Sequence, residues 1–137
     1  MPEWITVRTP EEGGQIATSR APFDPPTTQA LVKAARSVQP EPPATPPKSL
    51  FWVYVALLRY ANGEHGLYVG LTGLTPDRRY LNHKAGHKAS KSVLRHGIGL
   101  LPALYKHLGP LGRSAAESTE VELAEALRAT GTEVRQG

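Results

Sequence analysis

The chain contains no cysteine and no long apolar segment, and each absence excludes a class of protein. Without cysteine there is neither a disulfide framework nor a thiolate metal site, which favours a reducing compartment. A membrane-spanning helix needs about 18 consecutive apolar residues, and the sequence has no such run. Its start, Met1-Pro2-Glu3-Trp4, also lacks the basic and apolar regions of a secretory signal. We therefore expect a cytoplasmic protein with no membrane partner.

Acidic residues are scarce in the middle of the chain. Between residues 51 and 113, two carboxylates stand against nine arginines and lysines, and all five histidines lie in the same interval. Such an excess of positive charge is typical of proteins that bind nucleic acid, because each neutralised phosphate releases counterions. The other interpretation is an ordinary solvated basic surface. Charge alone leaves both open.

Proline is concentrated at one end, with ten of the thirteen prolines in residues 1–50. Proline interrupts both helices and sheets, so we predict that residues 1–49 form an arm without a core of its own. Within the arm, TTQALVKAARSV (27–38) has apolar residues at helical spacing and predicts one amphipathic helix. EWITV (3–7) could add a short strand. The arm either packs against the rest of the chain or docks a protein partner, and the sequence leaves both open.

Residues 50–137 have the pattern of a folded domain that begins with a β-hairpin. SLFWVYVALLRY (49–60) and GLYVGLTG (66–73) are rich in β-branched and aromatic residues and predict two strands. Between them lies Asn62-Gly63, a pair that tolerates the positive φ angles of a tight hairpin turn.

Helices are predicted after the hairpin. Thr75-Pro76 supplies an N-cap followed by proline in the first turn, and Gly86 supplies a stop. KSVLRHG (91–97) indicates a short helix, IGLLPALYKHL (98–108) a third strand or a mixed segment, and SAAESTEVELAEALRATG (114–131) a long helix. We predict an α+β fold in which a small, largely antiparallel three-stranded sheet is flanked by helices and preceded by the Pro-rich arm.

Four motifs occur in a fixed order within this domain. They are Val53-Tyr54-Val55, then Tyr68-Val69-Gly70, then the arginine-containing helix TPDRRYLNHKAG (75–86), and finally Ala116-Glu-Ser-Thr-Glu120. This order resembles the GIY-YIG nuclease superfamily, with the first two triplets standing where the GIY and YIG triplets stand. The resemblance covers residues 51–131, and within the superfamily it is closest to the small stand-alone endonucleases of bacteria and phages.

The resemblance implies a set of catalytic residues, namely Tyr54, Tyr68, Arg79, His83 and Glu120. It implies that Tyr54 or His83 activates the attacking water, that Tyr68 assists through a hydrogen bond, and that Arg79 holds the scissile phosphate. It further implies that Glu120 binds a catalytic Mg²⁺ or Mn²⁺ ion.

A glycine within a strand pattern usually marks a bulge or a close approach of another backbone. Gly70 occupies such a position. The resemblance implies a structural turn at Gly70 that lets the nucleic acid or the following loop come near the sheet.

The residue chemistry agrees with these roles on several points. A phenol with a pKa near 10 is a weak base at neutral pH, so Tyr54 needs a cation or a metal-bound water nearby. Arg79 and His83 are four residues apart and share one helix face, where a planar guanidinium suits phosphate oxygens. Glu120 and Glu122 point about 200° apart on their helix, so only one faces the site, and the A-x-x-x-E spacing selects Glu120.

The remaining cations of the basic helix have a different predicted role. We expect them to contact the phosphate backbone without taking part in the chemistry, and they are Arg78, Lys84, His87, Lys88 and Lys91. His83 and His87 have the spacing of a helical zinc pair, but no further ligand follows at a suitable distance. A single carboxylate fits Mg²⁺ or Mn²⁺ better than zinc.

The sequence therefore predicts a metal-dependent endonuclease that hydrolyses phosphodiester bonds, with DNA ahead of RNA as its partner. One alternative is a non-catalytic nucleic-acid-binding module of the same fold, which the altered Val53-Tyr54-Val55 triplet motivates. A second is a toxin-type nuclease restrained by a partner through the arm. A third is an interaction protein with a fortuitous basic patch.

Overall fold

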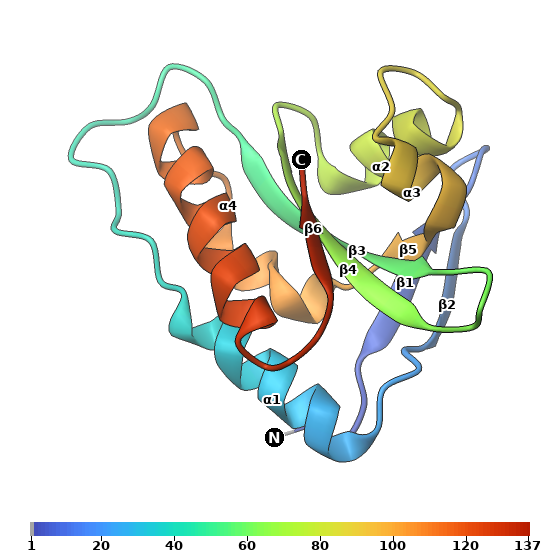
Figure 1. Cartoon of the computed structure of the whole chain (residues 1–137). Coiled ribbons are helices and arrows are strands. Elements are labelled where there is room, and N and C mark those ends of the chain that lie inside the picture. The colour runs from blue at the N-terminus through green and yellow to red at the C-terminus, as the bar shows by residue number, and fades with distance from the viewer. Residues whose placement is uncertain (1) are drawn as a thin grey trace.

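The computed structural model of the chain describes residues 2–137, which form one sheet with helices on both of its sides (Figure 1). The elements in chain order are β1 (Thr6–Pro10), β2 (Ile16–Arg20), α1 (Pro25–Ser37), β3 (Trp52–Arg59), β4 (His65–Thr72), α2 (Pro76–Lys84), α3 (Lys91–His96), β5 (Gly97–Leu100), the 3₁₀ turns η1 (Pro102–Leu104) and η2 (Lys106–Leu108), α4 (Arg113–Arg128) and β6 (Val134–Gln136). Among the described residues, no helix combines the length and apolar character needed to cross a membrane.

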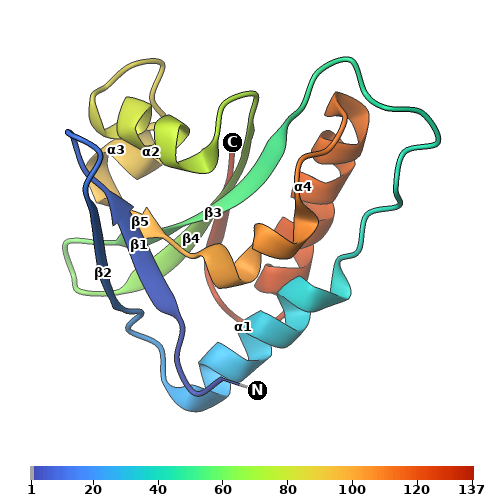
Figure 2. The ribbon, with the colours of Figure 1, turned by 180° about the vertical axis from the view of Figure 1, so that it is seen from behind.

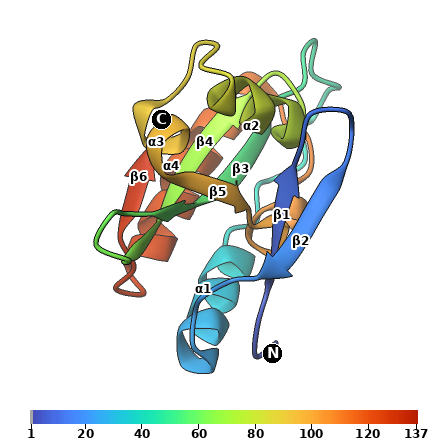
Figure 3. The ribbon, with the colours of Figure 1, turned by 90° about the vertical axis from the view of Figure 1, so that its right-hand side faces the viewer.

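The sheet has six strands in the order β2-β1-β5-β3-β4-β6, so the predicted three-stranded sheet is wrong. All neighbouring strands are antiparallel except β4 and β6, which are parallel. The β1–β2 hairpin extends the sheet at one edge and β6 extends it at the other (Figure 3). The error arose because the hairpin lies in the Pro-rich arm and β6 is only three residues long, so neither gave a strong strand pattern.

The hairpin of β3 and β4 is the centre of the sheet. Eight residue pairs join the two strands in unbroken register, from Trp52 opposite Thr72 to Arg59 opposite His65. Residues 53–58 are buried without interruption, which is the pattern of a strand covered on both faces. Helices α1 and α4 lie on one side of this hairpin, and α2 and α3 lie on the other (Figures 1 and 2).

The arm packs against the domain. Helix α1 buries Leu31, Val32 and Ala35 completely, and it contacts α4 and η1. At its C-terminal end, Nε2 of His107 lies 3.0 Å from the carbonyl of Ala35 and 3.2 Å from that of Val38, so the imidazole N–H is shared between two carbonyls of the last helical turn. Of the two arrangements that the sequence leaves open, the structure therefore shows an arm that covers the core.

The arm joins the sheet at a very close approach between β1 and β5. A Cβ added at Gly99 would collide with the side chain of Val7 and would lie 2.7 Å from Oγ1 of Thr9. The Thr9 hydroxyl also donates a hydrogen bond of 2.9 Å to the carbonyl of Ile98. Only glycine at position 99 allows the two strands to pack in this way.

Replacing Gly99 with alanine should therefore loosen the arm. We expect the free energy of unfolding to fall by about 1–3 kcal/mol, because the new methyl group overpacks the contact with Val7 and Thr9. Urea unfolding measures the loss, and amide hydrogen exchange in β1 should speed up. Gly73→Ala is the matched control, since its Cβ would meet only the Phe51 ring at 3.4 Å or more. Equal stability of the Gly99 and Gly73 variants would contradict the packing argument.

Candidate active site

A pocket of about 390 Å³ opens where β3 and β4 meet α2 and α4. We call it the Tyr54 pocket. Its walls contain five residues that the sequence singles out for function, and these are Tyr54, Tyr68, Gly70, Arg79 and Glu120. They come from β3, β4, α2 and α4, so it is the fold, and not proximity in the sequence, that brings them together.

Tyr54 is seated in the pocket by the glycine opposite it. Tyr54 and Gly70 are cross-strand partners in the β3–β4 hairpin. A Cβ on Gly70 would lie 2.7 Å from the Tyr54 hydroxyl and 2.8 Å from its Cζ atom. The missing side chain therefore makes room for the phenol ring. Gly70 lies within a strand and not in a turn, and the group that approaches its backbone is this tyrosine.

A hydrogen bond with His83 holds the Tyr54 hydroxyl in position. The Nε2 atom of His83 lies 2.8 Å from the hydroxyl oxygen of Tyr54, and its Nδ1 atom accepts a hydrogen bond of 2.9 Å from the backbone N–H of Ser90. Because Nδ1 accepts, the neutral imidazole carries its proton on Nε2 and donates it to Tyr54. The tyrosine hydroxyl is then free to donate its own proton to another acceptor.

This arrangement separates the roles of the two candidate bases. His83 is fully buried and both of its ring nitrogens are engaged, so it has no free nitrogen to take a proton from water. Tyr54 is also buried, but it lines the pocket. Of the two groups that the sequence leaves open as activators of water, only Tyr54 faces the space that a substrate would enter.

Burial controls the protonation of both residues. It raises the pKa of Tyr54 well above the ordinary value, an effect that the nearby Tyr68 reinforces and the Arg79 guanidinium opposes. Burial, together with the positive charge of Arg79, lowers the pKa of His83 to about 4. Near neutral pH the pair is therefore a neutral phenol and a neutral imidazole.

The side chain of Arg79, on α2, is held by a hydrogen bond to the loop that follows this helix. Its Nη2 atom donates a hydrogen bond of 2.9 Å to the carbonyl of Lys88. Lys88 has a positive φ of 49°, an uncommon conformation for a residue other than glycine, which places that carbonyl in the loop between α2 and α3. The guanidinium is thus oriented before any ligand binds, and it retains donors for a phosphate.

Glu120 is the most buried carboxylate of the chain that the structure describes, with 7% of its surface exposed. Burial raises its pKa, a hydrogen bond from the Gln136 side chain opposes this shift, and the charge of Glu117 reinforces it. A carboxylate that is expensive to ionise alone gains strongly from a nearby cation. Glu120 is therefore a suitable place for a metal ion.

The sequence analysis missed four residues that line the pocket, which are Leu71, Glu117, Val121 and Gly137. Glu117 lies one turn before Glu120 and also lines the pocket, although its carboxylate accepts a hydrogen bond of 3.0 Å from Arg113. Its three-residue spacing from Glu120 places both on one helix face and was a usable signal. Gly137 lines the pocket, and the Gln136 side chain donates to Glu120, because β6 pairs with β4. No local sequence pattern indicates that pairing.

The donor set suits a hard divalent cation. Residues 2–137 contain no group of three or more histidine, aspartate or glutamate side chains arranged around a common point. Zinc sites normally require such a group, whereas Mg²⁺ is often held by one or two carboxylates together with water and substrate phosphate. Glu120, with Glu117 beside it, fits the second pattern.

The residues that we expect to contact phosphate differ in whether the protein already engages their side chains. Arg78, His87, Lys88 and Lys91 are exposed, and none of the ion pairs among the described residues involves them. Lys84 is different, because its ammonium donates to the carbonyls of Leu94 at 3.1 Å and Gly97 at 3.0 Å. Two of its three donors therefore tie α2 to α3 and β5, which leaves one for a ligand.

Comparison of the chain with protein-family models, curated proteins and solved structures gave no match. The residues and their geometry therefore carry the functional argument alone.

Acid should destabilise the protein through His83. Its pKa is about 4 in the folded state and near 6.5 when unfolded, so the unfolded chain binds the proton more readily between these values. Stability from this residue is complete above about pH 6.5 and is lost as the pH falls toward 4. We expect the advantage of wild type over His83→Gln in free energy of unfolding to shrink by about 3 kcal/mol over this range.

Urea unfolding at a series of pH values measures this difference. Glu120, with its raised pKa, has an effect of opposite sign, but it is present in both proteins and cancels in the comparison. His87→Gln is the matched control because His87 is exposed. Parallel pH profiles for wild type and His83→Gln would show that the imidazole does not carry this linkage.

Proposed function

We propose that the protein is a metal-dependent endonuclease that hydrolyses phosphodiester bonds in nucleic acid, with DNA as the preferred substrate. The observation that carries the proposal is the convergence of Tyr54, Arg79 and Glu120 on one pocket from a strand and two separate helices. A hydroxyl, a guanidinium and a carboxylate are the groups needed to orient water, hold a phosphate and bind a divalent cation.

Each protein group has a defined task in this proposal. Arg79 binds the non-bridging phosphate oxygens through the donors that the Lys88 carbonyl leaves free. Tyr54, held by His83, orients the attacking water, and its deprotonated form accepts a proton from that water. Tyr68, which lines the same pocket, supplies a further hydrogen bond. The metal ion bound at Glu120 would supply charge stabilisation at the leaving oxygen.

The surface charge supports nucleic acid as the substrate. The chain carries a net charge of +4, and the exposed cations Arg78, His87, Lys88 and Lys91 lie on α2, at the start of α3 and in the loop between them. Arg79 projects into the Tyr54 pocket from the same helix. Phosphates on either side of the scissile bond would therefore meet positive charge next to the pocket.

Glu120→Gln should abolish cleavage while preserving the fold. The amide keeps the shape of the side chain but removes the negative charge that binds the cation, so we expect a loss of at least about 100-fold in rate. The assay follows the cleavage of plasmid, single-stranded DNA and RNA with and without Mg²⁺ or Mn²⁺. Glu122→Gln is the matched control, because Glu122 is exposed on the same helix.

Two results of this assay would reject the proposed activity. One is the absence of metal-dependent cleavage of all three substrates at high protein concentration, which would favour the non-catalytic binding module. The other is cleavage that is equally fast in Glu120→Gln and wild type, which would indicate a contaminating nuclease.

Cleavage should become faster as the solution becomes more alkaline. Burial raises the pKa of Tyr54, so the fraction that is deprotonated increases tenfold per pH unit below that pKa. We expect log kcat/KM to rise with a slope near one from pH 7 to about pH 10, without a plateau. The Tyr54→Phe variant should be strongly impaired and lack this rise. A plateau near neutral pH in wild type would exclude Tyr54 as the proton acceptor.

A further inference from the structure

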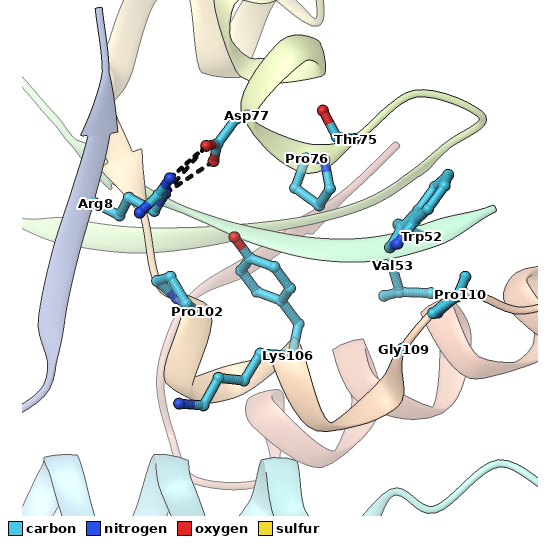
Figure 4. A pocket seen from close by; sticks show the side chains of 11 residues that line it. Arg8, Trp52, Val53, Thr75, Pro76, Asp77, Pro102, Lys106, Gly109 and Pro110 are labelled. Carbon is cyan, nitrogen blue, oxygen red and sulfur yellow. Dashed lines mark hydrogen bonds and ion pairs between the residues drawn. The ribbon is translucent and has the colours of Figure 1, made fainter. Parts of the chain in front are cut away.

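A second cavity shares no lining residue with the Tyr54 pocket and has no role in the proposed reaction. It measures about 590 Å³ and lies between β1 and the first residues of β3, where the short strand β5 has ended. We call it the Trp52 pocket, after one of its wall residues (Figure 4). Its other functional groups are Arg8, Asp77, Tyr105 and Lys106.

Rigid rings form much of the wall. Trp52 and Pro110 stand at one end of the pocket, and Pro76 lies between them and the polar end (Figure 4). Pro102 adds another ring. Such walls offer flat apolar surface that loses little conformational entropy when a ligand binds, and tryptophan has a π face on which a heterocycle stacks. The shape and chemistry suit a planar aromatic ring.

The opposite end of the pocket is polar and already organised. Arg8 and Asp77 form a two-pronged ion pair, in which Nε lies 3.1 Å from both carboxylate oxygens and Nη2 lies 2.7 Å from Oδ2 (Figure 4). The carboxylate keeps unused lone pairs, and Nη1 of the guanidinium makes no hydrogen bond with any described residue. This end therefore offers both an acceptor and a donor to the edge of a ring.

Tyr105 is the second, independent sign of a ligand. It is only 8% exposed and lines the pocket, yet its hydroxyl makes no hydrogen bond to any described residue. Every fully buried side-chain nitrogen or oxygen atom among the described residues does have a partner, so this hydroxyl is accessible from the cavity. A hydroxyl that has no partner in the protein and is accessible from the cavity is a ready hydrogen-bonding group for a bound molecule.

We propose that the Trp52 pocket binds an unpaired nucleobase of the nucleic-acid substrate. The base stacks on Trp52 and the proline rings, and its polar edge meets Tyr105, Asp77 and the free Nη1 of Arg8. The exposed ammonium of Lys106 at the rim contacts the adjoining phosphate. The inference rests on the proposed function for its choice of a polymer substrate, and it narrows that substrate to single-stranded or locally unpaired nucleic acid.

Strand β3 and helix α2 each contribute residues to both pockets. On β3, Val53 lines the Trp52 pocket and the next residue, Tyr54, lines the Tyr54 pocket. On α2, Pro76 and Arg79 line the two pockets respectively, and they are about 4.5 Å apart along the helix axis. Neighbouring nucleotides of a strand that crosses the start of β3 would place a phosphate at Arg79 and an unpaired base against Trp52.

Tryptophan fluorescence tests the proposal by binding alone. The variant Trp4→Phe leaves Trp52 as the only tryptophan. This protein also carries Glu120→Gln, so that no cleavage interferes. It is titrated without metal against single-stranded DNA of about eight nucleotides, a matched strand in which every base is removed, the matching duplex, and a mononucleotide. We expect quenching by the intact strand, and affinities for the abasic strand and the duplex that are at least about tenfold weaker.

Three point variants, with a fourth as control, locate the binding. Tyr105→Phe, which keeps the ring and the fold, and Lys106→Ala should each weaken binding of the intact strand by several fold. Lys33→Ala removes an exposed lysine of α1 and should leave it unchanged. Trp52→Phe should weaken binding in a competition assay with labelled DNA, without loss of the folded circular dichroism spectrum.

The outcomes separate this inference from the proposed function. Equal affinity for the intact and abasic strands overturns the inference even when wild type cleaves DNA. Tight binding of the mononucleotide, equal to that of the strand, also overturns it and indicates a site for free nucleotides. Base-dependent quenching with no cleavage by wild type supports the pocket while rejecting the nuclease.

Discussion

The buried hydrogen bond between Tyr54 and His83 is the interaction on which the candidate site depends. It joins the central strand β3 to helix α2, and the Ser90 backbone fixes the imidazole from the other side. Removing one partner would leave a buried polar group unsatisfied, which costs about 1–3 kcal/mol. The same helix carries Arg79 four residues earlier, so the contact that orients the phenol also sets the position of the guanidinium.

Burial affects the protonation of the titratable groups at this site. The pKa shifts of Tyr54 and His83 keep both groups uncharged near neutral pH, and burial also disfavours the charge on Glu120. In the absence of a substrate, the pocket holds the guanidinium of Arg79 on one side and the carboxyl groups of Glu117 and Glu120 on the other. A phosphate would pair with Arg79 and a divalent cation with Glu120, which makes cation binding and substrate binding mutually supportive.

The sequence predicted local features better than the sheet. The hairpin turn at Asn62-Gly63 and the start of α2 at Thr75-Pro76 follow from the conformations of a few adjacent residues, and both are confirmed. The number of strands was wrong, because the pairing of β1 with β5 and of β6 with β4 depends on residues far apart in the chain. The shared pocket of Tyr54 and Arg79 was anticipated only through the order of the motifs. The sequence could not predict the tautomer of His83 or the Trp52 pocket, since each depends on groups from several elements.

The late positions of β5 and β6 in the sequence determine when the sheet can be completed during synthesis. Arg8 near the start of the chain pairs with Leu100, and β6 closes the far edge with Val134 to Gln136. Pairings of such long sequence separation form slowly, because the intervening chain loses entropy before the contacts form. Glu120 and Gln136 belong to the same late portion. A ribosome-bound chain therefore presents Tyr54 and Arg79 without their acidic partner, and the complete site assembles only after residues 120–136 have emerged.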